Sequence, residues 1–127
     1  MSIAIVYPCL YEVGGIARYL QSLLKNLPQM TAGEKIVVIT NDSGYDGSEY
    51  AGVEVVRIPM RRNRLGLIVW SAKVRRMLLK LYKKKKISLV NLHLPPLIVG
   101  LFMPRSIPLV LTVHTTYYGM SGRYSRL

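Results

Sequence analysis

The alternation of short apolar runs with longer amphipathic segments constrains the fold of this chain more than any other feature. Five runs of branched apolar residues have the length of buried strands, at residues 3–7, 35–40, 53–58, 88–92 and 109–113. Apolar residues recur at helical spacing over residues 16–27, where we expect the helix to stop near Pro28, and over residues 65–85. This alternation predicts an α/β fold with a doubly wound parallel sheet.

The size and composition of the chain predict one domain with a hydrophobic core. Half of the 127 residues are hydrophobic, which argues against disorder. Cys9 is the single cysteine and cannot form an internal disulfide, which favours a reducing compartment. The apolar run at residues 97–103 is much shorter than the ~20 residues of a membrane-spanning helix. We therefore expect a cytoplasmic protein, soluble or peripheral on the inner face of the membrane.

The net charge of +12 is concentrated in the second part of the chain. All six acidic residues lie within residues 12–54, whereas residues 55–127 carry fifteen Lys and Arg and no acid. Such a split predicts an anionic partner: a membrane, a nucleic acid or a phosphorylated substrate. A solvated basic face without a partner is the simpler alternative.

We expect an anionic membrane to bind the densest basic segment, residues 57–86, which holds twelve of these side chains. The residues predicted to contact it are Arg61, Arg62, Arg64, Lys73, Arg76 and Lys80. Leu65, Leu67 and Ile68 are predicted to enter the lipid interface, together with Trp70 if that side chain does not pack on the sheet. In the alternative, the helix packs its apolar face on the sheet and its basic face is simply solvated.

Candidate ligand-binding residues follow the predicted strands, because ligands of open parallel sheets bind at the carboxyl ends of the strands. Gly14 and Gly15 precede the first helix, where backbone amides can approach an anion closely, although such a turn also serves backbone geometry alone. His93 and His114 follow the fourth and fifth strands. Each alone is often a structural loop residue, but two at equivalent positions favour a shared site.

The sequence gives little support for a metal centre or a hydrolase triad. No acid or cysteine lies near either histidine in the sequence, so we expect no metal ion. A G-x-S-x-G motif is absent, and Cys9 has no flanking signature of a catalytic cysteine.

Four segments together resemble the retaining GT-B glycosyltransferases of family 4, in the expected order and over nearly the whole chain. They are VGGIAR at 13–18, KIVVIT at 35–40, VNLH at 90–93 and LTVHT at 111–115. N-terminal domains of that family typically open with a strand, a Gly-Gly loop and a helix, and later carry a Thr-Val-His segment. The chain departs from the pattern at Ser88, where Asp is common, and at residues 116–118, where a Gly is common after the histidine.

The resemblance implies a Rossmann-like sheet of about five strands in the order 3-2-1-4-5, the N-terminal half of a GT-B fold. Residues 1–127 would be a single, truncated acceptor-binding domain, inactive without the C-terminal domain that binds the nucleotide-sugar. It implies no cofactor, and a hexosyl transfer with retention to an acceptor that can be lipid-linked. His114 would be catalytic beside the donor sugar, and the substrate or the donor phosphates would be bound by Gly14, Gly15, Arg18, His93 and Thr115.

Three classes of function remain open at this point. The first is the glycosyltransferase domain. The second is a basic module for nucleic acid or another anionic ligand, although the aromatic-interleaved basic strands of RNA-recognition sheets and zinc-binding spacings are missing. The third is a stand-alone flavodoxin-like binding domain. Arg18 also has a simpler interpretation, as a solvent-facing residue of the first helix.

Overall fold

The computed structural model describes residues 2–10, 15–30, 34–41, 50–61, 63–93 and 105–112, without the side chains of residues 28–30. Within these ranges it contains five strands and two helices. In chain order they are β1 (Ser2–Val6), α1 (Gly15–Met30), β2 (Lys35–Thr40), β3 (Val53–Arg57), α2 (Arg64–Lys83), β4 (Leu89–Leu92) and β5 (Leu109–Leu111). The predicted α/β pattern is therefore confirmed.

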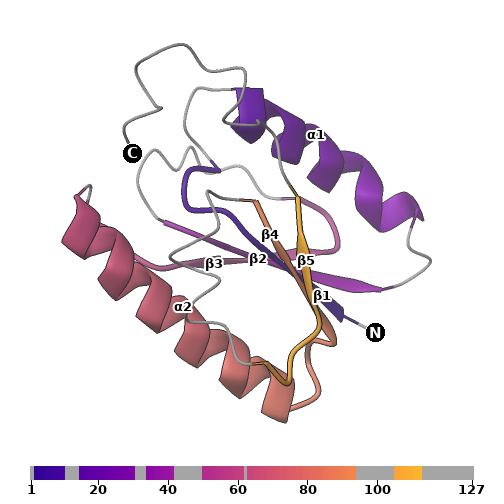
Figure 1. Ribbon diagram of the computed structural model, residues 1–127. Helices are drawn as coiled ribbons and strands as arrows, with labels where there is room; N and C mark the ends of the chain where they lie inside the picture. Colours follow the sequence, from indigo (N-terminus) through magenta and orange to yellow (C-terminus); the bar gives the residue numbers. More distant parts are fainter. Residues whose placement is uncertain are drawn as a thin grey trace.

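The strands form one parallel sheet in the order β3-β2-β1-β4-β5, as predicted. The two helices cover opposite faces of this sheet (Figure 1). The arrangement is the Rossmann-like, doubly wound one, in which every strand ends at the same edge. All loops that follow the carboxyl ends of strands are thereby gathered at one side of the molecule.

Strands β1 and β2 are buried on both faces because successive side chains point to opposite sides of a strand. Ala4 and Val6 of β1 belong to the cluster that packs against α2, whereas Ile5 between them packs against α1. Strand β2 alternates in the same way, with Val37 and Ile39 toward α2. This burial on both faces explains why the two strands are nearly continuous apolar runs in the sequence.

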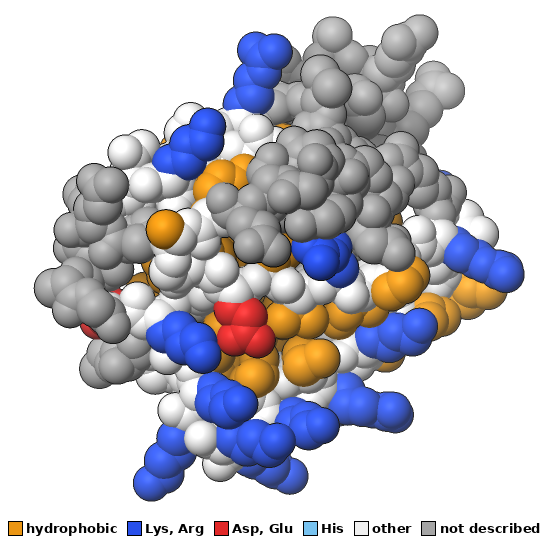
Figure 2. Space-filling view, turned by 180° about the vertical axis from the view of Figure 1, so that it is seen from behind, with side chains coloured by type: hydrophobic (Ala, Val, Ile, Leu, Met, Phe, Trp, Pro, Cys, Tyr) orange, Lys and Arg blue, Asp and Glu red, His pale blue; other side chains and the backbone are white. Residues whose placement is uncertain are grey.

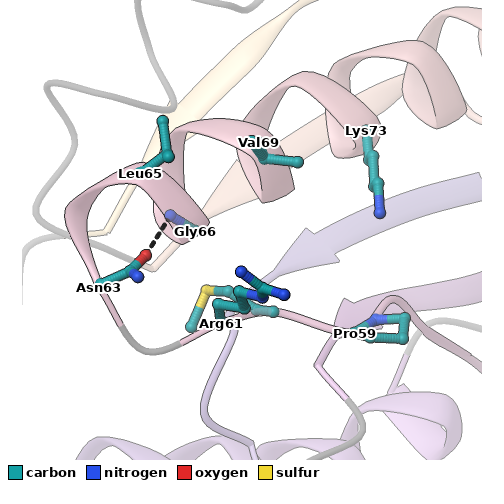
Figure 3. A pocket seen from close by; sticks show the side chains of 8 residues that line it. Pro59, Arg61, Asn63, Leu65, Gly66, Val69 and Lys73 are labelled. Carbon is teal, nitrogen blue, oxygen red and sulfur yellow. Dashed lines mark hydrogen bonds between the residues drawn. The ribbon is translucent and has the colours of Figure 1, made fainter.

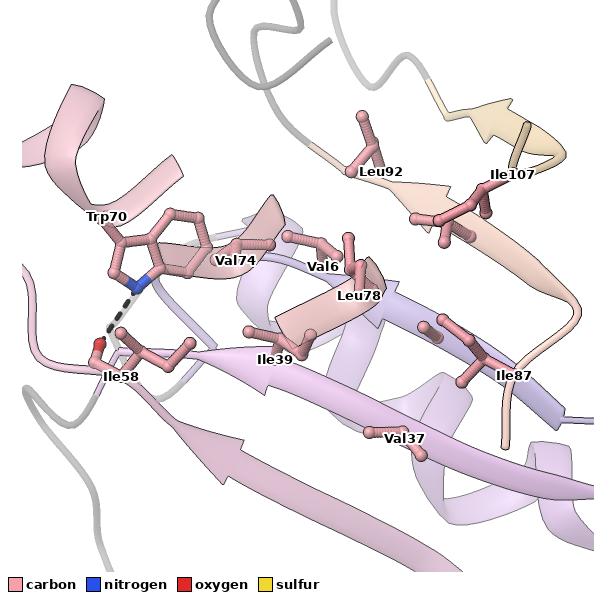
Figure 4. Close-up of a cluster of buried hydrophobic side chains, with 12 residues drawn as sticks. Val6, Val37, Ile39, Ile58, Trp70, Val74, Leu78, Ile87, Leu92 and Ile107 are labelled. Carbon is pink, nitrogen blue, oxygen red and sulfur yellow. Dashed lines mark hydrogen bonds between the residues drawn. The ribbon is translucent and has the colours of Figure 1, made fainter. Parts of the chain in front are cut away.

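Trp70 anchors α2 to the sheet. Its side chain is fully buried beside Val74 and Leu78, which follow it at four-residue spacing on one face of the helix (Figure 4). The indole nitrogen donates a hydrogen bond of 2.9 Å to the carbonyl oxygen of Ile58, just after β3. Of the two alternatives for Trp70, packing on the sheet is therefore the one observed, and Trp70 does not face a lipid.

Both helices end within two residues of the predicted positions. Helix α1 runs past Pro28 to Met30. Pro28 lacks an amide donor and its ring crowds the carbonyl four residues before it, but its place in the last turn confines this disturbance to the end of the helix. Helix α2 ends at Lys83 rather than near residue 85, because Lys85 adopts a φ of 56°. The amides of Lys85 and Lys86 then bond back to the carbonyls of Tyr82 and Leu81. These two bonds form a Schellman turn, which closes a helix whatever its apolar periodicity.

Replacing Trp70 by Ala should lower the free energy of unfolding by about 3–5 kcal/mol, because the change leaves a cavity under α2 and an unpaired Ile58 carbonyl. Urea denaturation followed by circular dichroism measures this loss. Leu65→Ala on the same helix is the control, since Leu65 is 69% exposed. It should change stability by less than about 0.5 kcal/mol. A Trp70→Ala loss as small as that of the control would contradict the anchoring role.

Candidate functional site

The ends of β1, β4 and β5 meet at the carboxyl edge of the sheet. The amide of His93 donates to the carbonyl of Val6 over 3.1 Å, and the amide of Thr112 donates to the carbonyl of Leu92 over 2.9 Å. The loop after β1 leads into the first turn of α1 at the same edge. The residues that the sequence predicted to bind a ligand after different strands are thus brought toward one place by the topology.

Thr40 ties the loop after β1 to the end of β2. Its hydroxyl donates to the carbonyl of Pro8 over 3.1 Å and accepts the amide of Leu10 over 3.3 Å. The amide of Asn41 also donates to Pro8, over 3.1 Å. From the helix side, Gln21 of α1 donates to the carbonyl of Leu10 over 2.9 Å. These bonds fix the position of Pro8 and Leu10, which precede the start of α1.

Gly15 is the first residue of α1, and none of the described residues crowds it. Among the described residues, a Cβ built on Gly15 would meet no atom within 4 Å, and the φ of Gly15 does not lie in the left-handed region. Among the described residues, therefore, neither crowding nor backbone conformation at this position requires a glycine. Gly14, the other predicted glycine, lies outside the described residues.

His93 lies at the end of β4 as predicted, but its side chain is 1% exposed. The ring of Tyr19, from the second turn of α1, stands 6.4 Å from the imidazole at a tilt of 41°. Tyr19 itself is 49% exposed. His93 therefore belongs to the interior of this edge, and Tyr19 presents the aromatic surface in front of it.

Tyr7, directly after β1, adds a half-buried hydroxyl near the same edge. Burial raises the pKa of the Tyr7 phenol above its usual value of 10.0, and the neighbouring Cys9 adds to the rise. A phenol with a raised pKa keeps its proton at neutral pH and acts as a hydrogen-bond donor. The sequence pattern assigned no role to Tyr7, Tyr19 or Thr40. The partners of Tyr19 and Thr40 come from distant segments, and the burial of Tyr7 depends on the packing of the fold.

The residue that follows β5, Thr112, is hydrogen-bonded to β4 two positions before His114. The hydroxyl of Thr112 bonds to the side-chain oxygen of Asn91 in β4 over 2.9 Å, in addition to its backbone bond to Leu92. His114 and Thr115 themselves lie outside the described residues. Their predicted roles therefore remain predictions.

Arg18 lies in the first turn of α1, with an exposed side chain. It shares an exposed stripe with Ser22 and Lys25, at the spacing of one helical turn. This placement agrees with the simpler interpretation of a solvent-facing arginine, and it also leaves Arg18 one turn from Gly15.

The basic residues predicted to bind a membrane are exposed wherever the structure describes them. Arg61 precedes α2, and Arg64, Lys73, Arg76 and Lys80 lie on it. Figure 2 shows Lys and Arg side chains gathered along one margin of the molecule. Arg62 lies outside the described residues.

The part of the chain that the structure describes holds neither a metal-binding cluster nor a membrane-spanning helix. No cluster of three or more His, Cys, Asp or Glu side chains is close enough there to hold a metal ion. Neither of the two described helices is long and apolar enough to cross a bilayer.

Comparison with known families assigns the chain. The model of Glycosyltransferase Family 4 matches residues 13–127, which is most of the sequence and includes α1, all of α2 and the strands from β2 onward. The chain belongs to glycosyltransferase family 4. Comparison with curated proteins gives no match, so the family model carries this assignment. The sheet of this family-4 domain, in the order 3-2-1-4-5, is consistent with the N-terminal half of a GT-B enzyme.

Replacing Thr40 by Val in the family-4 domain should cost about 1–3 kcal/mol of unfolding free energy, because the buried Leu10 amide loses its acceptor, while the Pro8 carbonyl keeps only the Asn41 amide as donor. Chemical denaturation measures the loss. Ser88→Ala is the matched control at the opposite edge of the sheet. The carbonyl that Ser88 bonds, that of Ser2, keeps the Ser88 amide as a donor, so the control should cost less than about 1 kcal/mol. Equal losses would mean that Thr40 does not organise this loop.

Proposed function

We propose that this domain is the acceptor-binding half of a glycosyltransferase that moves a sugar from a nucleotide-sugar to an acceptor. The observation that supports the proposal most directly is the position of the first turn of α1. It begins at Gly15, which no described residue crowds, at the edge where β1, β4 and β5 end. A second domain of the GT-B type would face this edge and bind the nucleotide.

The first turn of α1 is suited to the diphosphate of the donor. The first amides of a helix lack intrahelical partners and, with the helix dipole, favour an anion there by about 0.3–1 kcal/mol at an exposed site. No acidic side chain in the first turn of α1 competes for these amides. Because the departing diphosphate gains negative charge in the transition state, donors fixed in advance stabilise it. Arg18 supplies a positive charge one turn further on.

Tyr19 and the two histidines complete the proposed site. The exposed ring of Tyr19 offers an apolar surface to a sugar, and the buried His93 behind it keeps that ring in place. By the family resemblance, His114 stands beside the donor sugar as the catalytic residue, with Thr115 and Gly14 as further binding residues. The transfer retains the configuration of a hexosyl donor and requires no metal ion or other cofactor.

The proposal assigns the nucleotide to a domain beyond these 127 residues, and this can be tested directly. The isolated chain should bind UDP-sugars and GDP-sugars with dissociation constants weaker than about 1 μM, which corresponds to less than about 8 kcal/mol of binding free energy. Isothermal titration calorimetry measures these constants. A micromolar or tighter constant for the chain alone would overturn the two-domain assignment.

Two substitutions test the site in a protein that includes the donor-binding domain. His114→Ala should lower kcat by about 10²–10³, the usual effect of losing one transition-state donor. Gly15→Val should lower it further, since a side chain there stands between the backbone and the phosphates. Steady-state kinetics measures both, and Ser22→Ala, exposed on the same helix, is the control that should keep full activity.

The same variants separate a functional role from a structural one. A Cβ at Gly15 meets no described atom within 4 Å, so Gly15→Val should unfold within about 0.5 kcal/mol of the unsubstituted protein. Near-normal turnover of either variant would remove that residue from the site, and a large loss of stability on Gly15→Val would show a structural role instead.

A further inference from the structure

The outward face of α2 changes character along the helix. In its first two turns, three large aliphatic side chains are exposed, namely Leu65 at 69%, Ile68 at 41% and Val69 at 46%. Beyond them, the same side of the helix carries exposed Lys73, Arg76 and Lys80. A helix on the surface of a globular protein normally turns polar residues outward, so clustered aliphatic side chains there indicate a contact with another surface.

A cleft of about 480 Å³ adjoins these aliphatic side chains. It lies between the segment after β3 and the first turns of α2 (Figure 3), and its lining consists of Pro59, Met60, Arg61, Asn63, Leu65, Gly66, Val69 and Lys73. Two cations, Arg61 from the segment and Lys73 from the helix, thus border the same hollow as Leu65 and Val69.

The cleft is held in shape by the start of α2. The side-chain oxygen of Asn63 accepts the amide of Gly66 and caps the helix. A Cβ on Gly66 would collide with the backbone carbonyl of Arg61, so the absence of a side chain lets this segment lie directly against the helix. Arg61 is therefore presented from backbone that is packed on α2.

We propose that this part of the surface docks on an anionic membrane. The α2 docking face consists of Arg61, Arg64, Leu65, Ile68, Val69 and Lys73. Its aliphatic side chains enter the lipid interface, while its three cations bind the phosphate and acidic headgroups around them. Arg76 and Lys80 extend the positive surface along the helix. This inference does not depend on the proposed glycosyl transfer, because none of these residues lies at the start of α1 or at the end of β4.

Charge complementarity and side-chain type favour a membrane over a nucleic acid. No Asp or Glu occurs from residue 55 to residue 127. The part of the chain that forms the α2 docking face therefore contributes no acidic side chain that would repel an anionic surface. Proteins that bind single strands stack bases on aromatic rings. Of the described large hydrophobic residues that are exposed, the one aromatic is Tyr19, on α1 across the sheet. Aliphatic side chains beside cations match lipid instead.

The structure also corrects which apolar residues can reach the lipid. Leu67 is half-buried against the core, so this predicted contact points toward the sheet. Trp70, a candidate only if it did not pack on the sheet, is fully buried there. Val69, which the sequence did not single out, takes their place. Because Trp70, Val74 and Leu78 hold the opposite side of α2, docking requires no unfolding of the helix.

Co-sedimentation of the chain with vesicles tests the proposal. Vesicles of phosphatidylcholine alone are compared with vesicles that also contain phosphatidylglycerol, at salt concentrations from about 50 to 500 mM. Binding should require phosphatidylglycerol and weaken as salt rises. The triple variant Arg61→Gln, Arg64→Gln, Lys73→Gln should bind about a hundredfold more weakly at low salt, since each cation near an anionic surface strengthens binding about fivefold.

Two further variants distinguish binding through the α2 docking face from a general attraction between the positively charged chain and anionic lipid. Lys83→Gln, Lys84→Gln, Lys86→Gln removes the same charge at the far end of α2 and should weaken binding less than tenfold. Leu65→Gln, Ile68→Gln, Val69→Gln keeps every charge and should weaken binding at all salt concentrations, most visibly at about 500 mM, where attraction between charges is screened. All these side chains are exposed, and circular dichroism checks that each variant is folded.

Three results would overturn the proposal. The first is equal weakening by the two charge variants, and the second is unchanged binding by the aliphatic variant. The third is binding of RNA or DNA by a chain that ignores anionic vesicles at low salt, which would establish a nucleic-acid module instead. None of these results bears on sugar transfer, which is measured separately.

Discussion

The burial of β1 and β2 on both faces is the constraint on which the rest of this domain depends. A strand with apolar side chains on both sides needs a helix on each face, and α1 and α2 meet this need from opposite directions. The parallel connections that follow place every strand's carboxyl end at one edge. The positions of the proposed glycosyltransferase site and of the cleft beside α2 are both consequences of this packing.

These two regions share an edge but lie at different strands. The proposed site is built where β1, β4 and β5 end, from the first turn of α1 and the Tyr19 and His93 pair. The cleft lies after β3, beyond β2 in the strand order. Thr40, at the end of β2, stands between them and bonds the loop that leads to α1. If α2 docks the protein on a membrane as proposed, an acceptor in that membrane would approach the proposed site along the same edge of the sheet.

The strands and their order could be predicted because their cause is local. Apolar runs of strand length mark buried strands wherever they pair, and the family resemblance supplied the order. The ends of the helices were harder to predict from the sequence, because α2 is closed by the backbone conformation of Lys85 and not by a change in apolar spacing. The positions of Gly15 at the start of α1 and of His93 at the end of β4 were predicted, but the burial of His93 depends on packing at the edge, including the ring of Tyr19 from another element. The exposure of Val69 likewise follows from the rotation of α2, which Trp70 fixes through Ile58.

Trp70 also gives the protein an internal spectroscopic reporter. It is the single tryptophan of the sequence, and its indole lies at the contact between α2 and the sheet with its nitrogen bonded to the chain after β3. Tryptophan emission from this chain therefore arises at the contact between α2 and the sheet. It reports whether α2 stays attached to the chain after β3. Events at the start of α1, on the other face of the sheet, are separated from this fluorophore by the sheet itself. A change in emission thus reports on the α2 layer, and a ligand that binds beside α1 without disturbing that layer leaves the emission unchanged.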